Sequence, residues 1–285
     1  MKKTVRFLVL VCGILAVATL FSISYSQAQL QAEDVKTVAA LKAVIAGGHR
    51  AEADTARDKY RHPLETLSFF GVKDNMKVVE MWPDGGWYTD ILAPFLKERG
   101  IYYAAGFDSQ ASVEFMRNGA QKYKAKLDAK PDLFGKVKTT VFYAPEKTDI
   151  APEGSADMVL TFRNVHNWMA DGQAEAAFKA MFRALKPGGV LGVVEHRANP
   201  TVPQDPKAAS GYVREDTVIK FAEDAGFKFV GKSEINANPK DTKDYAQGVW
   251  TLPPVLRLKD VDKEKYLAIG ESDRMTLKFT KPATK

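Results

Sequence analysis

The sequence predicts a doubly wound α/β fold, in which helices cover both faces of a mostly parallel sheet. Short apolar patterns typical of buried strands alternate with helical patterns from residue 77 to residue 233. Such alternation indicates parallel strands joined by helical crossovers. In addition, residues 78–89 have the pattern of a buried strand, a tight turn containing glycine, and the start of a helix. Folds of this class bind nucleotide-like cofactors at such a turn, because backbone can approach closely and the helix N-terminus offers free N–H groups.

The first part of the chain is expected to be helical and to precede the sheet. Two short helices are predicted at residues 34–45 and 50–61, separated by Gly47-Gly48. His62-Pro63 ends the second helix, since a residue before proline avoids the helical conformation. The alternation of strands and helices begins after residues 64–71.

The part of the chain in which strand and helix patterns alternate forms the sheet and the helices that cover it. Strands are expected at residues 77–80, 101–108, 138–143, 156–162, 190–195, 227–233 and 274–279. Helices are expected at residues 88–99, 112–127, 173–185 and 217–225. Lys186-Pro187-Gly188-Gly189 closes the third of these helices, and Gly226 closes the fourth. Residues 235–270 interrupt the rhythm with prolines and aromatic residues, so we expect an insertion over the sheet edge rather than a separate domain.

The N-terminus has the features of a secretory signal peptide. Lys2, Lys3 and Arg6 form a basic region, residues 7–23 are apolar, and Ser26-Gln27-Ala28 offers small residues for cleavage. The apolar run is short for a membrane span, which needs about 20 residues. We expect cleavage near residue 28, an exported and periplasmic protein of residues 29–285, and no stable membrane anchoring afterwards. The alternatives are an uncleaved N-terminal anchor and a cytoplasmic protein.

Composition excludes several classes of function. The only cysteine, Cys12, lies in the signal segment, so residues 29–285 contain no disulfide, thiolate metal site or catalytic thiol. Without the signal, the formal net charge falls from +6 to about +3, and lysines are interspersed with acidic residues. No basic stripe interleaved with aromatic residues is present, so we do not expect a nucleic-acid partner. No motif indicates the oligomeric state.

The strongest resemblance to a known family lies in residues 178–195, a helix, the turn Lys186-Pro187-Gly188-Gly189 and an apolar strand. This stretch resembles the helix, turn and fifth strand of class I S-adenosylmethionine-dependent methyltransferases, and residues 222–227 (AEDAGF) resemble the turn before their later strands. The resemblance covers roughly residues 50–282. It implies a Rossmann-like, mostly parallel seven-stranded sheet with one antiparallel strand near the edge, and S-adenosylmethionine as cofactor.

A narrower resemblance involves the loop after the first strand. Trp82-Pro83 with residues 85–89, residues 163–168 and the closing residues 274–279 are similar to a group of secreted bacterial proteins described as methyltransferases. The loop stands where the family has an E/D-x-G-x-G-x-G motif, but Trp82 and Asp84 replace its first two glycines and Gly86 alone is kept. The indole of Trp82 would fill part of the methionine pocket or form a wall of it. Asp84 would place a negative charge near the cofactor's carboxylate.

The resemblance and the strand ends together suggest a set of cofactor-binding residues. The set comprises Glu80, Trp82, Asp84, Gly85, Gly86, Asp108, Arg163 and Asn164. Asp108 ends the second strand, where an acid accepts hydrogen bonds from ribose hydroxyls; the alternative is that it caps the next helix. Glu80 could contact the cofactor's ammonium or bond the N–H groups of the turn. The exit of the third strand, Tyr143-Ala144-Pro145, lacks the acid that often contacts adenine.

Two histidines are candidate general bases. His166 follows the fourth strand, where these methyltransferases place residues beside the transferred methyl group, and His196 ends the fifth strand on the same rim. Histidine exchanges protons near neutral pH, so either could deprotonate a nucleophile. Both could also be structural residues that bond a loop.

Other enzyme classes are disfavoured by missing motifs. No G-x-G-x-x-G supports a dinucleotide oxidoreductase, no G-x-S-x-G supports an α/β-hydrolase, and no histidine spacing supports a metal site. We therefore expect an exported S-adenosylmethionine-dependent methyltransferase that acts on a small molecule. The alternative is a secreted, non-catalytic ligand-binding protein that keeps this fold with a decayed cofactor site.

Overall fold

The fold is seen in a computed structural model that describes residues 33–283. The chain divides into two compact units, residues 1–43 and residues 44–285. In the first unit the described residues 33–43 are helical, in agreement with the first predicted helix. The predicted signal segment lies outside the described residues. No helix in the part of the chain that the structure describes is both long and apolar enough to cross a membrane.

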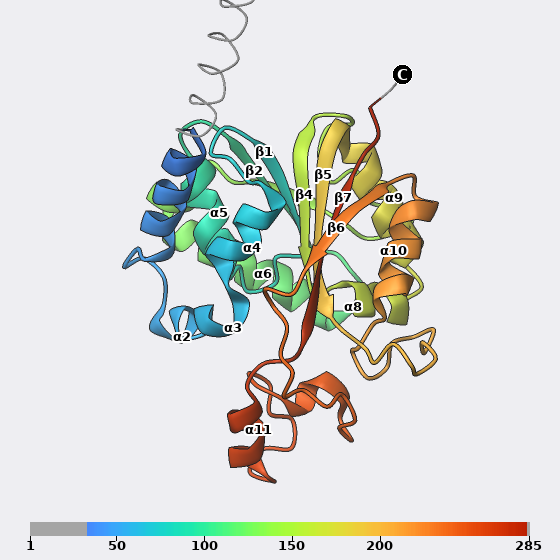
Figure 1. The fold of residues 1–285 in the computed structure, drawn as a ribbon. Helices are drawn as coiled ribbons and strands as arrows, with labels where there is room; N and C mark the ends of the chain where they lie inside the picture. The colour runs from blue at the N-terminus through green and yellow to red at the C-terminus, as the bar shows by residue number, and fades with distance from the viewer. Residues whose placement is uncertain (1–32, 284–285) are drawn as a thin grey trace, which may run out of the picture. The chain divides into compact units, whose positions relative to one another are not determined.

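The second unit is built on a seven-stranded sheet formed by its described residues (Figure 1). The strand order is β3-β2-β1-β4-β5-β7-β6. Strand β7 is antiparallel to both β5 and β6, and the remaining neighbours pair in parallel. The predicted fold, with one antiparallel strand next to the edge, is confirmed. The strands are β1 (Lys77–Met81), β2 (Ile101–Gly106), β3 (Lys138–Val141), β4 (Ala156–Phe162), β5 (Leu185–His196), β6 (Lys228–Ser233) and β7 (Arg274–Thr280).

Helices lie on both faces of this sheet (Figure 1). One side carries α4 (Pro63–Phe70), α5 (Thr89–Leu96) and α6 (Glu114–Ala129), and the other carries α8 (Val165–Ala170), α9 (Ala174–Ala184) and α10 (Glu215–Asp224). Shorter helices are α2 (Glu52–Thr55), α3 (Asp58–Arg61), α7 (Pro131–Phe134), α11 (Lys263–Ile269) and the 3-10 turn η1 (Gly248–Thr251).

The core explains why the sequence forms these layers. Phe178 and Met181 lie three residues apart on α9, so both point from one face of the helix into the core. They belong to the same buried cluster as Val159 of β4 and Leu191 of β5, and none of the four side chains is accessible to solvent. Burying an apolar side chain of this size contributes about 1.5–3 kcal/mol.

The main differences from the predicted elements concern the N-terminal helices and the start of strand β5. The second N-terminal helix is split into α2 and α3, and the segment that follows it forms the unpredicted helix α4, for which Pro63 occupies the first turn. Strand β5 begins at Leu185 rather than at residue 190, because Leu185 pairs with Ala156 before the register shifts. The ladder is irregular between Leu185 and Val190, where the chain has one proline and two glycines, and Gly188 there has a φ of 78°.

Parallel strands that end together create one functional edge. The ends of β1, β2, β4 and β5 lie at the same edge of the sheet, and antiparallel β7 starts there. The segment between β6 and β7, predicted as an insertion over the sheet edge, extends beyond this carboxyl edge and carries η1 and α11 (Figure 1). The sheet therefore brings together residues from distant parts of the sequence at one place.

Candidate active site

A cavity of about 520 Å³ lies at the carboxyl edge of the sheet. Its volume falls within the range of small-molecule and cofactor sites. Eight predicted site residues line it: Glu80, Trp82, Asp84, Gly85, Arg163, Asn164, His166 and His196. Gly86 and Asp108 do not line it. A second cavity of about 540 Å³ lies between α6, α7 and strands β2 and β3, but it has no histidine or arginine in its described lining.

The loop after β1 has the backbone of a glycine-rich turn although two of its glycines are absent. Trp82, Asp84 and Gly86 have φ angles of 46°, 48° and 76°. These are the three positions at which the resembled motif has glycine, and this left-handed region is unfavourable for a bulky side chain such as tryptophan. The chain therefore keeps a strained conformation at the loop, and such strain is concentrated at functional sites.

The side chain of Trp82 fills the space behind this loop. The indole is buried, and its ring centroid lies 5.0 Å from that of Phe107, 6.0 Å from that of Phe142 and 5.6 Å from that of Trp168. Its Nε1–H donates a hydrogen bond to the carbonyl oxygen of Phe142 at 3.1 Å. Trp82 is thus part of an aromatic cluster and at the same time a wall of the cavity. No atom lies within 4 Å of where a side chain at Gly85 would begin, so this part of the loop is open.

Glu80 is a buried acid within a chain of hydroxyl groups. Tyr102 donates a short hydrogen bond to its Oε2 atom, and Thr89 Oγ1 lies 3.0 Å from the hydroxyl oxygens of both Tyr102 and Tyr123. Burial raises the pKa of Glu80 to about 7, although the Tyr102 hydrogen bond and the positive charge of Arg163 oppose that rise. Glu80 therefore changes its charge near neutral pH at the base of the cavity.

Asp108 is buried and already bonded within the protein. Its Oδ1 accepts a hydrogen bond from the backbone N–H of Gln110 at 2.9 Å, and its Oδ2 accepts one from Lys147 Nζ at 2.6 Å. These bonds, that from Lys147 first, lower the pKa of Asp108. The Gln110 bond is an Asx-type turn. The alternative expectation that Asp108 caps the next helix is wrong, because Val113 is the N-cap of α6 and no side chain bonds the start of that helix. Ribose binding by Asp108 stays a prediction, and it requires Lys147 to share or leave this carboxylate.

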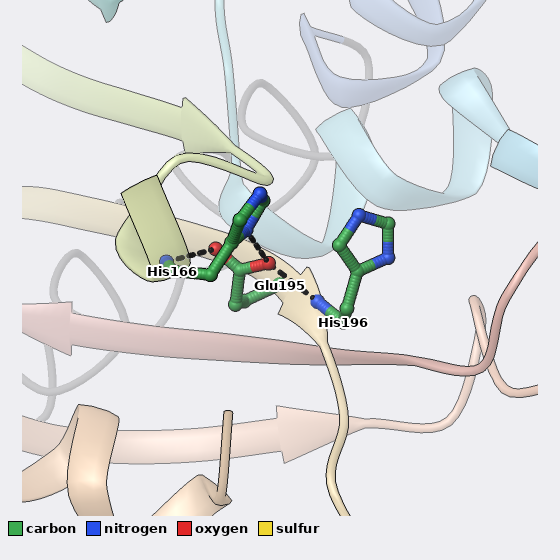
Figure 2. A group of neighbouring side chains, drawn as sticks. All are labelled: His166, Glu195 and His196. Atoms are coloured by element: carbon green, nitrogen blue, oxygen red, sulfur yellow. Dashed lines mark hydrogen bonds and ion pairs between the residues drawn. The ribbon is translucent and has the colours of Figure 1, made fainter. Parts of the chain in front are cut away.

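His166 is held by Glu195, a residue outside the predicted site (Figure 2). Its Nδ1 lies 3.0 Å from Glu195 Oε1. The same carboxylate accepts backbone N–H bonds on both oxygens, from Val165 at 2.6 Å and from His196 at 2.7 Å. Because both oxygens act as acceptors, the Nδ1 atom of His166 must carry the proton. Its Nε2 atom is then a proton acceptor, and Figure 2 shows that this nitrogen points away from Glu195.

His196 is less suited to act as a base. Its Nδ1 lies 2.6 Å from Ser272 Oγ, and its ring centroid lies 5.3 Å from that of His166. Burial lowers the pKa of His196 well below its usual value, and the charges of His166 and Arg274 lower it further. The ring remains neutral at physiological pH and lines the cavity beside His166.

The same cluster offers the atoms for a metal ion, which the sequence pattern did not indicate. One ligand atom each from His166, Glu195 and His196 lies within 4.8 Å of the others. However, Glu195 is completely buried and its oxygens are taken up by backbone N–H groups of α8 and β5. A metal ion would have to displace those bonds, so the geometry favours an acid–histidine pair.

Asn164 joins two strand ends. Its Nδ2 donates to the carbonyl oxygen of Met81 at 2.8 Å and lies 3.2 Å from Thr161 Oγ1. The side chain is buried, and it fixes the exit of β4 against the loop after β1. Its contribution to the site is to hold the loop in place.

Several cavity residues escaped the sequence analysis because they come from outside the expected strand ends. Arg61 and Arg57 come from α3 and the residue before it, and Trp250 comes from η1. Arg274 is the first residue of β7, and Glu271 lies three residues before it. The ring of Trp250 lies 5.9 Å from that of His166. For Arg274 the sequence did contain a signal, because residues 274–279 belong to the resemblance to secreted bacterial proteins. The inserted segment offered no signal of its own.

No protein-family model matches this chain, and no curated protein matches it by sequence. Solved structures do match. An S-adenosylmethionine-dependent methyltransferase from Aquifex aeolicus has 16% identity and a TM-score of 0.52, over 79% of this chain and 93% of that one. The fold is that of class I methyltransferases. Phosphoethanolamine N-methyltransferase 2 of Haemonchus contortus, in complex with S-adenosyl-L-methionine, has 15% identity and a TM-score of 0.53, over 80% of this chain and 57% of that one.

The methyltransferase fold does not by itself determine the reaction. The cyclase SpnF has 16% identity and a TM-score of 0.50, over 89% of this chain and 95% of that one. Structures at this level of identity share a fold, and their chemistry differs with the residues at the site. The residues of the cavity therefore determine which reaction this chain can carry out.

Proposed function

We propose that this protein is an exported S-adenosylmethionine-dependent methyltransferase whose acceptor is a small molecule. The observation that carries the proposal is the Glu195–His166 pair on the wall of a 520 Å³ cavity, at the edge where the methyltransferase fold binds its ligands. A putative sarcosine dimethylglycine methyltransferase from Galdieria sulphuraria shares the fold with 11% identity and a TM-score of 0.51, which supports a small acceptor.

The cavity fits the cofactor in size and in the charge of its lining. Its volume suits a nucleoside-linked amino acid, and the carboxyl groups of Glu80 and Asp84 in its lining would attract the cofactor's ammonium and sulfonium. The indole of Trp82 offers an aromatic face to a sulfonium. The left-handed backbone of the loop further supports this assignment. When bound, S-adenosylmethionine supplies an activated methyl group.

The protein's own residues then orient the acceptor and remove its proton. Methyl transfer is an in-line displacement, so the largest contribution of the protein is to hold two reactants in line. Glu195 fixes the tautomer and the direction of His166, whose Nε2 accepts the proton of the nucleophile. Trp250 and the inserted segment cover this side of the cavity and limit the access of water.

Calorimetry tests directly whether the protein binds the cofactor. The purified protein should bind S-adenosylmethionine and S-adenosylhomocysteine with micromolar affinity. Glu80→Gln should weaken both, whereas Glu98→Gln, at an exposed surface acid, should bind both like the parent. Absence of binding by the folded parent protein would contradict the proposal.

A turnover assay tests the role of His166 as the general base. S-adenosylhomocysteine release should be screened against small molecules that bear hydroxyl, amine or carboxyl groups. With an acceptor in hand, His166→Gln should lower kcat by about 10²–10⁴-fold while cofactor binding is retained. Full activity of His166→Gln would rule out its role as a base.

Two observations favour a second candidate, a secreted non-catalytic ligand-binding protein. Trp82 occupies a glycine position of the cofactor loop, and Lys147 is bonded to the carboxylate that would receive the ribose. Export would also separate the protein from the cytoplasmic supply of cofactor. This candidate predicts a ligand in the cavity and no response to S-adenosylmethionine.

The proposed location rests on residues outside those described. The basic start, the apolar run and the small residues before Gln29 support export, and the resemblance to secreted bacterial proteins points the same way. The predictions for the N-terminus below test this part of the proposal separately.

A further inference from the structure

One wall of the cavity has a large excess of positive charge. Arg57, Arg61, Arg163 and Arg274 all line it, and Glu271 is the one acid that forms ion pairs with them among the described residues. Glu271 Oε1 lies 2.6 Å from Arg57 Nε, and its Oε2 lies 3.3 Å from Arg61 Nε and in a short contact with Arg274. Three guanidinium groups thus share a single buried carboxylate, and the fourth, that of Arg163, forms no ion pair with it.

Glu271 is fully committed to its three partners. Burial alone would raise its pKa, but the charges of Arg274, Arg61 and Arg57 outweigh burial and lower it to about 2. The carboxylate is therefore ionised at every physiological pH, and it cannot neutralise a fourth arginine.

Arg163 is that fourth arginine, and it has no partner. Within residues 33–283 its guanidinium forms no hydrogen bond and no ion pair, although the residue is partly buried. Its backbone has a φ of 63°, an unfavourable value for a residue other than glycine. Burial lowers the pKa of Arg163 to about 10, and the charge of Arg274 contributes to this shift. The guanidinium of Arg163 is thus an unpaired cation close to other cations, and the backbone of this residue is strained.

One further donor on the same wall is unsatisfied. Arg274 Nε is buried and has no hydrogen-bond partner among the described residues. Arg61 is buried, and its guanidinium carbon lies 4.7 Å from the ring centroid of Trp87, which fixes its plane. Buried donors without partners are rare in native proteins and indicate a missing acceptor.

The other acids of the cavity do not compensate for these charges. Asp84 and Asp171 lie at the exposed rim, and Asp54 forms no ion pair with the four arginines among the described residues. Glu80 is bonded by Tyr102 and is protonated in part near neutral pH. The interior wall therefore carries a net positive charge that a ligand must balance.

We propose that this wall binds an anionic group of the methyl acceptor, a carboxylate or a phosphate, with Arg163 as its principal ligand. The inference rests on the proposed function and names the substrate class of that site. Arginine binds both groups through paired N–H donors. Arg163 lies three residues before His166 and both line the same cavity, so one acceptor can contact both residues.

The cofactor's own carboxylate is the other source of such an anion, and the sequence resemblance predicts Arg163 among the cofactor-binding residues. The acceptor is favoured because Arg163 lies in the turn between β4 and α8, next to the first turn of α8 that carries the candidate base, whereas the loop of Trp82 and Asp84 follows β1. A test must therefore distinguish an anion that binds in addition to the cofactor from the carboxylate of the cofactor itself.

Calorimetry with inorganic phosphate and with succinate provides this test. The parent protein should bind at least one of them with millimolar or tighter affinity. Arg163→Gln should weaken that binding at least tenfold, and Arg163→Gly, which suits the observed φ, should do the same without backbone strain. Arg99→Gln, at an exposed arginine paired with Asp74, should bind like the parent.

Titration with S-adenosylhomocysteine in saturating phosphate then identifies the source of the anion. Unchanged or tighter binding of S-adenosylhomocysteine supports an acceptor subsite, and competition between the two overturns it. Failure of both anions to bind, or equal binding by the folded Arg163→Gly variant, also overturns the inference. Anion binding without any S-adenosylhomocysteine binding would contradict the proposed methyl transfer while leaving the anion site in place.

Discussion

The indole Nε1 of Trp82 lies 3.1 Å from the carbonyl oxygen of Phe142, so a residue at a glycine position of the cofactor loop is bonded to the end of the third strand. This hydrogen bond draws the indole into an aromatic cluster with Phe107 and Trp168. The side chain is therefore integrated into the fold, which favours an adapted cofactor pocket over a decayed one.

Trp82→Gly should destabilise the protein. Truncation of a buried aromatic side chain costs about 3–5 kcal/mol, and relief of the left-handed strain returns about 1 kcal/mol of this. Chemical denaturation measures the difference. Trp82→Phe serves as the control, since it keeps a ring and loses the hydrogen bond to Phe142. We expect Trp82→Gly to leave S-adenosylmethionine affinity unchanged or weaker.

The double variant Trp82→Gly with Asp84→Gly distinguishes adaptation from decay. It restores all three glycines of the resembled loop, and both replaced residues have positive φ angles. If the loop is adapted, calorimetry should show no gain in affinity for S-adenosylmethionine. Binding that becomes tighter by a factor of ten, equal to about 1.4 kcal/mol, would instead establish decay.

Glu80 should make stability fall as pH rises from about 5 to about 7. Its pKa is raised to about 7 in the folded protein and is about 4.3 in an unfolded chain. The folded state therefore binds more protons across this interval, so the free energy of unfolding decreases as pH increases, by on the order of 3 kcal/mol.

Urea denaturation at several pH values should show this slope in the parent and its loss in Glu80→Gln. Tyr102→Phe is informative because its hydrogen bond lowers the pKa of Glu80. Removing the bond should move the pH-dependent interval upward. Identical slopes in the parent and Glu80→Gln would show that Glu80 titrates normally.

Asp108→Ala should weaken S-adenosylmethionine binding by about 1–3 kcal/mol if the carboxylate receives the ribose. Lys147→Met should strengthen binding in that case, because it frees the Oδ2 atom that Lys147 occupies at 2.6 Å. Calorimetry and thermal melting should be measured on both variants. A lower Tm of Asp108→Ala with unchanged affinity would assign Asp108 to the turn alone.

The exported protein should begin near Gln29. Cleavage after Ser26-Gln27-Ala28 removes the basic start and the apolar run. Intact-mass spectrometry on fractionated cells measures the N-terminus directly. Soluble protein recovered from the cytoplasm with Met1 or Lys2 still attached would contradict export.

The sequence by itself determined the order and type of the main elements. Strand β4 was predicted at its observed bounds, and β1, β6 and β7 to within one residue. Apolar periodicity, glycine turns and strand–helix alternation are local properties, and they are set by neighbours along the chain. Glu80, His166 and His196 followed from the same reasoning, because parallel strands end at one edge of a sheet.

The tertiary structure alone decided which side chains complete the cavity. Glu195 lies 29 residues from His166, and Arg57 lies 214 residues from Glu271. The α4 helix escaped prediction as well, since its identity depends on packing against β5, where the Phe70 ring lies close to Gly192. Ion pairing and packing act through space, so the charge of one wall of the cavity emerges only when α3, β4 and β7 meet.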